Sequence, residues 1–88
     1  MTTKTATPTL EEIQAKIYVL LGRIAPEADL DTLSPDEEVR AALDIDSFDL
    51  LMLLIDLNKA FGVDIPERDY GQLTTVRETA AYIAERVA

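Results

Sequence analysis

The residues best suited to chemistry in this sequence are the adjacent Asp46 and Ser47. They lie where an acidic segment gives way to an apolar stretch, residues 48–61, that is long enough for a helix. At this junction the Ser47 hydroxyl can accept a hydrogen bond from an amide of the first turn and so cap the helix. If it points outward instead, it is a nucleophile at the positive end of the helix dipole, which would hold a phosphate placed on it. The residue pair by itself permits both interpretations.

The composition restricts every other source of reactivity. The 88-residue chain contains no His and no Cys, which excludes Ser-His and Cys-His nucleophile pairs and the common zinc sites. Asp44, Asp46 and Asp49 resemble the start of a calcium loop. An EF-hand, however, needs Gly at the sixth position and Glu at the twelfth, where this chain has Asp49 and Ile55. We therefore predict that the chain has no metal site and is not an enzyme. Any reactive group would be supplied from outside the chain.

The net charge of −9 is concentrated in one part of the chain. Residues 36–69 contain ten acidic and three basic residues. Such a field repels nucleic acid and anionic lipid and attracts partners with basic patches. No apolar run is long enough to span a membrane, and no secretory signal pattern opens the sequence. We expect a cytoplasmic monomer that binds neither nucleic acid nor membranes.

Hydrophobic periodicity and capping residues predict three long helices, over about residues 10–24, 47–61 and 76–87. Thr9 and Glu12 have the spacing of a capping box at the start of the first helix, and Pro26 follows its end. Gly62 ends the second helix as a left-handed cap. Either Thr74 or Thr75 caps the third.

Shorter elements are expected between the long helices. Ser34 followed by Pro35 predicts a short helix over residues 35–43, and Pro66 can begin another through about residue 70. The long first connection should be anchored on the core by its apolar residues, Leu30, Leu33, Val39, Leu43 and Ile45. The sequence therefore predicts an all-α four-helix bundle, with three main helices, a short third helix and a long first loop. Residues 1–8 form a flexible lead and residues 9–88 the domain.

The helix over residues 47–61 has more apolar residues than one buried stripe requires. At the helical repeat, one group gathers on one side: Leu50, Leu53, Leu54, Leu57 and Phe61. Phe48, Met52 and Ile55 form a second stripe. This second stripe is either buried in the centre of the bundle or exposed for partner binding, and Phe48 and Met52 are the residues we expect to be exposed if it is the latter.

Several segments together resemble the acyl carrier protein family. They are Leu-Asp-Ile-Asp-Ser-Phe at residues 43–48, Phe-Gly-Val-Asp-Ile-Pro at 61–66, and Leu-Thr-Thr-Val at 73–76 leading to Tyr-Ile at 82–83. The resemblance extends over about residues 10–87. It implies a small helical carrier to which a phosphopantetheinyl transferase attaches 4′-phosphopantetheine from coenzyme A. The terminal thiol of this arm then carries an acyl group as a thioester.

The resemblance also implies roles for individual residues. Ser47 would be the attachment point, and Asp46 would help to position magnesium during the transfer. The helix after the serine and the loop before it would bind partner enzymes, through Phe48, Met52, Ile55, Asp44 and Asp49. These partners would be acyl- or aminoacyl-activating and transferring enzymes, and the core between the helices would shelter a short acyl chain.

The chain also departs from typical fatty-acid carriers. Phe48 stands where the family usually has Leu. Acidic residues of those carriers are replaced at four positions, by Met52, Asn58, Lys59 and Ala60. These differences favour a specialised carrier for fatty-acid, lipid or secondary-metabolite synthesis. Two alternatives remain open: an aminoacyl or peptidyl carrier with the same serine, and an acidic helical adaptor without a covalent arm, in which Ser47 only caps the helix.

Overall fold

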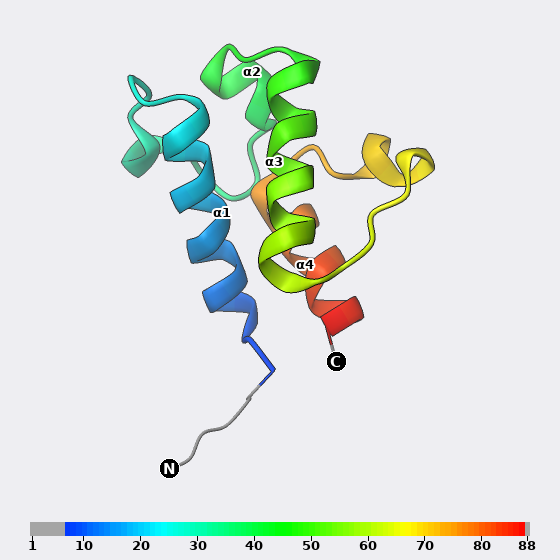
Figure 1. Ribbon diagram of the computed structural model, residues 1–88. Helices are drawn as coiled ribbons and strands as arrows, with labels where there is room; N and C mark the ends of the chain where they lie inside the picture. Colours follow the sequence, from blue (N-terminus) through cyan, green and yellow to red (C-terminus); the bar gives the residue numbers. More distant parts are fainter. Residues whose placement is uncertain (1–6, 88) are drawn as a thin grey trace.

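Helices account for the architecture of the computed structural model, which describes residues 7–87 (Figure 1). These residues form three long helices, α1 Leu10–Ile24, α3 Ser47–Phe61 and α4 Val76–Val87. They also form the short helix α2 Val39–Leu43 and two 3-10 turns, η1 Leu30–Thr32 and η2 Glu67–Gln72. The all-α prediction and the bounds of the three long helices are confirmed. The expected lead, residues 1–8, lies outside the described residues except for Thr7 and Pro8.

The core lies where α1 packs against both α3 and α4. The largest fully buried side chains come from all three helices and from the segment before α4: Ile13, Ile17, Leu21, Leu53, Leu54, Leu57, Leu73, Val76 and Ile83. In Figure 1, η2 lies on the side of α3 opposite α1. None of the helices within residues 7–87 is long and apolar enough to span a membrane.

The helix ends follow the capping residues seen in the sequence. The Glu12 amide donates to Thr9 Oγ1 at 3.1 Å, and the Thr9 amide donates to Glu12 Oε1 at 2.7 Å, which completes the capping box. Gly62 has a φ of 67° and closes α3, as expected of a left-handed cap. At the start of α4, Thr75 Oγ1 accepts the Glu78 amide at 3.0 Å, so Thr75 and not Thr74 is the capping residue.

The long first connection is anchored by the five apolar residues predicted for it. Leu33 and Val39 are buried, and the other three are half-buried against the core: Leu30, Leu43 and Ile45. The Tyr18 hydroxyl of α1 donates to the Leu33 carbonyl at 2.8 Å and fixes the middle of the connection. The sequence did not predict η1, because three residues are too few to show a periodicity.

The helix predicted over residues 35–43 is shorter than expected and begins only at Val39. Residues 34–37 form a turn instead, in which the Ser34 amide donates to Glu37 Oε1 at 2.7 Å. Glu38 is extended and forms an isolated bridge with Thr75. The Val39 amide donates to the Thr74 carbonyl at 2.9 Å. The segment at the start of α4 thus supplies hydrogen-bond partners for Glu38 and Val39. In a helix that began at residue 35, these residues would bond within the helix instead.

The second short element also differs in detail from its prediction. It was expected over residues 66–70 and is the 3-10 turn η2, with Pro66 as the residue before it. A 3-10 turn forms here because no residue of η2 is buried, so there is no apolar face to favour a longer α-helix.

An ion pair reinforces the attachment of the first connection to α4. The Arg77 amide donates to the Pro35 carbonyl at 2.9 Å, and the Arg77 guanidinium pairs with the Asp36 carboxylate. The hydrogen bond from Arg77 is the main cause of a lowered pKa at Asp36, and the same bond raises the pKa of Arg77. Both side chains are exposed, so solvent screens the pair and its contribution to stability is small.

This ion pair predicts the titration of Asp36. Because its pKa is lowered in the folded state, the stabilisation is present above the pKa of the unfolded chain and is lost as the pH falls through the folded pKa. In an NMR titration of the carboxyl groups, we expect the pKa of Asp36 to rise in Arg77→Gln and to stay unchanged in Arg23→Gln. Equal titration of Asp36 in the wild type and in Arg77→Gln would show that the pair does not persist in solution.

Candidate functional site

The start of α3 is capped by Asp46. Its backbone is extended, with φ −94° and ψ 178°, and its Oδ1 accepts the Asp49 amide at 3.0 Å. Ser47 is therefore the first residue of the helix and not its cap. The capping interpretation of Ser47 is wrong for a local reason. A serine cap would accept the Asp49 or the Leu50 amide. The first donates to the Asp46 carboxylate, and the second donates to the Asp46 carbonyl at 3.2 Å.

The Ser47 hydroxyl is displayed to solvent. Ser47 is exposed, and its hydroxyl has no hydrogen-bond partner among residues 7–87. It lies in the first turn of a 15-residue helix, where unpaired amides and the helix dipole favour negative charge. The arrangement suits an oxygen nucleophile whose product carries a phosphate.

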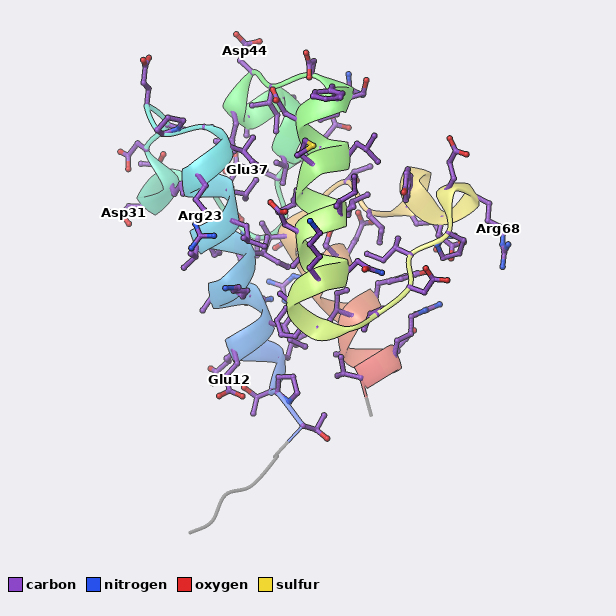
Figure 2. All side chains as sticks on the ribbon, viewed as in Figure 1. Glu12, Arg23, Asp31, Glu37, Asp44 and Arg68 are labelled. Carbon is purple, nitrogen blue, oxygen red and sulfur yellow. The ribbon has the colours of Figure 1, made fainter. Side chains whose placement is uncertain are left out.

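The turn before α3 presents this serine by a sharp change of chain direction. Asp44 ends α2 with a left-handed backbone, φ 54°, a conformation that Asp adopts more readily than most residues. The Ile45 amide donates to the Arg40 carbonyl at 3.1 Å, and the Ile45 side chain is half-buried. Figure 2 shows the Asp44 side chain at the end of the molecule, directed away from the helices.

The second apolar stripe of α3 is exposed. Phe48 is 64% exposed, Met52 39% and Ile55 38%. The other side of the helix supplies the core residues Leu53, Leu54 and Leu57. The structure thereby excludes the interpretation that this stripe is buried in the centre of the bundle. Asp44 is exposed and Asp49 half-buried beside this stripe.

A hollow of about 260 Å³ lies beside Ser47. Its wall on α3 consists of Leu50, Leu51 and Leu54. The facing wall consists of Tyr70 and Gly71 of η2, with Thr74 after it. Glu38 and Arg40 also border it. The sequence reasoning missed the residues from this facing wall, because only the folded chain brings them to α3.

The described residues contain no metal centre of their own. Within residues 7–87, no three or more acidic side chains lie together in a way that could hold an ion. The neighbouring acids Asp44, Asp46 and Asp49 are therefore not a preformed calcium site.

Comparisons with known proteins show which family this chain is similar to. Residues 15–83 match the family described as "Phosphopantetheine attachment site". The chain is 36% identical to the acyl carrier protein of Rubrobacter xylanophilus over 76 residues, covering 85% of this chain and 91% of that protein. It is 37% identical to the acyl carrier protein of Lactobacillus johnsonii over 75 residues, covering 85% and 92%. The solved structure of the acyl carrier protein from Enterococcus faecalis has the same fold, with a TM-score of 0.74 at 21% identity, covering 90% of this chain and 99% of that one.

The assignment of the cap predicts a contrast between neighbouring substitutions. Asp46→Ala removes the acceptor of the Asp49 amide and should lower the free energy of unfolding by about 1 kcal/mol. Asp46→Asn keeps an equally good cap and should be close to neutral. Ser47→Ala should also be close to neutral, because its hydroxyl caps nothing. Urea denaturation measures all three, and a Ser47→Ala cost as large as that of Asp46→Ala would restore the serine as the cap.

Proposed function

This chain belongs to the acyl carrier protein family, and we propose that Ser47 is its attachment site for 4′-phosphopantetheine. Acyl carrier proteins are carriers and not enzymes, and 4′-phosphopantetheine is their cofactor. The sequence has only two serines, Ser34 and Ser47. The Ser34 hydroxyl accepts the Asp36 amide at 3.2 Å within a turn. The observation that carries the proposal is the exposed hydroxyl of Ser47 at the start of α3.

The first turn of α3 suits this attachment in two ways. Its amides and the helix dipole would stabilise the negative charge of a phosphodiester on Ser47 Oγ. Asp46 adjoins the same residue and would contribute a carboxylate oxygen to magnesium shared with the transferase during the transfer. The arm, once bound, supplies the thiol that this cysteine-free chain lacks and that holds the acyl group as a thioester.

The hollow beside Ser47 would shelter the cargo. It lies next to the attachment point, and the leucines of α3 make one of its walls apolar. An acyl chain that turns back from the arm can leave water there, at a gain of roughly 0.8 kcal/mol for each buried methylene.

The exposed stripe of Phe48, Met52 and Ile55 would be the partner surface. It begins directly after Ser47, so an enzyme that reaches the serine or its arm would cover it. Asp44 and Asp49 lie beside it and would pair with basic groups of the transferase and of enzymes that load or remove acyl groups. Exposed aromatic and Met side chains of this kind often anchor an interface.

Modification of Ser47 can be measured directly by mass spectrometry. The apo chain is incubated with coenzyme A, magnesium and a broad-specificity phosphopantetheinyl transferase. We expect the mass to increase by about 340 Da, the mass that the arm adds. Ser47→Ala should show no increase, while Ser34→Ala, the matched control, should be modified like the wild type. An unmodified wild type, or a modified Ser47→Ala, would refute the attachment at Ser47.

The partner surface predicts a selective defect in the same reaction. Phe48→Ala should lower kcat/KM of the transferase for this carrier by about tenfold, the effect of removing an aromatic anchor from an interface. Its stability should change little, because Phe48 is mostly exposed. Val19→Ala removes an apolar side chain of similar exposure from α1 and should leave kcat/KM unchanged. Equal rates for the two variants would place the transferase elsewhere on the carrier.

A further inference from the structure

Two hollows follow one another along α3 and share a boundary. The first is the hollow of about 260 Å³ beside Ser47. The second, of about 190 Å³, lies towards the end of the helix and is bordered by Ile55 and Ile65, among others. Leu54 and Tyr70 line both hollows. These two side chains therefore separate a near space, next to the attachment point, from a far space.

The two boundary residues differ in how firmly the fold holds them. Leu54 is buried in the core and is 2% exposed. Tyr70 is half-buried and belongs to η2, a turn in which no residue is buried. The Tyr70 hydroxyl has no hydrogen-bond partner among the described residues. Its ring lies at the boundary of the two hollows, and no polar contact within residues 7–87 fixes it there.

The position of Tyr70 is set by its neighbour. The buried Tyr82 of α4 donates its hydroxyl to Asp69 Oδ2 at 2.6 Å. The Arg86 guanidinium lies over the Tyr82 ring, 3.5 Å from its centroid, and holds that ring in place. The hydrogen bond to Asp69 is the main cause of a raised pKa at Tyr82. This contact ties η2 to α4 one residue before Tyr70.

We propose that Tyr70 determines the length of the acyl chain that this carrier shelters, by closing the near hollow at its far end. The inference rests on the proposed attachment at Ser47, because a chain that starts there enters the near hollow first. A smaller residue at position 70 joins the two hollows and admits a longer chain. A larger residue shortens the near hollow. Tyr82 and Asp69 are positioning residues that act through Tyr70.

The test is a series of loaded carriers. The arm is transferred to Ser47 from saturated acyl-coenzyme A thioesters with chains of about 4 to about 12 carbons, and the unfolding midpoint of each product is measured. The midpoint of the wild type should rise with chain length and then level off, because each methylene that leaves water stabilises the folded state until the hollow is full. The chain length at which it levels off is the sheltered length.

Substitutions at Tyr70 should move this length in opposite directions. Tyr70→Ala and Tyr70→Leu should extend it by about two carbons or more, and Tyr70→Trp should shorten it. The matched control is Tyr18→Leu, which removes another half-buried tyrosine, far along the chain on α1, and should leave the length unchanged. If Tyr70→Ala does not fold, the Leu and Trp variants still give opposite shifts.

The positioning role has a separate readout. Tyr82→Phe removes the hydroxyl bonded to Asp69 and should raise hydrogen exchange in η2 by about tenfold. It should also extend the sheltered length by less than Tyr70→Ala does. Tyr18→Phe loses a hydroxyl bonded to the Leu33 carbonyl and should leave exchange in η2 unchanged.

The outcomes separate the two proposals. A sheltered length that is the same in the wild type and in the Tyr70 variants, or that shifts equally in Tyr18→Leu, overturns the role of Tyr70 while the attachment at Ser47 stands. Failure to load any arm on the wild type refutes the attachment itself, and with it the inference.

Discussion

The hydrogen bond from the Asp49 amide to the Asp46 carboxylate is the interaction on which the site depends. Every long helix has free amides in its first turn, and some group must accept them. Here the residue before the serine does so, and Ser47 takes the first helical position with its hydroxyl exposed. Had the serine been the cap, its oxygen would have been engaged and held close to the backbone. A single contact therefore stabilises α3 and leaves the Ser47 hydroxyl exposed.

Helix α3 has three different faces, because what lies against each face differs. The face toward α1 is buried and holds the bundle together. The face that begins at Phe48 has no covering element in the described residues and is exposed. The face toward η2 is only partly covered. Hollows remain between α3 and this 3-10 turn, none of whose residues is buried. The excess of apolar residues in α3 follows from these three surfaces.

The elements around α3 are held by backbone and polar contacts in addition to their apolar anchors. Residues 34–39 are attached to the start of α4 through the Val39 and Arg77 amides and the pair of Asp36 with Arg77. On the other side, the Tyr82 hydroxyl holds η2 through Asp69. Both attachments run to α4, so this helix positions the two borders of the hollow beside Ser47 without lining it.

The sequence by itself determined the bounds of the three long helices, because periodicity, caps and glycine stops act within a few residues along the chain. Its motifs also identified the family. What only the tertiary structure decided depends on contacts between distant segments. The segment from residue 35 is not helical, since its amides and carbonyls meet the start of α4. The stripe at Phe48 is exposed because no element within residues 7–87 covers it. The wall at Tyr70 exists because η2 folds back onto α3, a pairing that leaves no local pattern in the residues that form it.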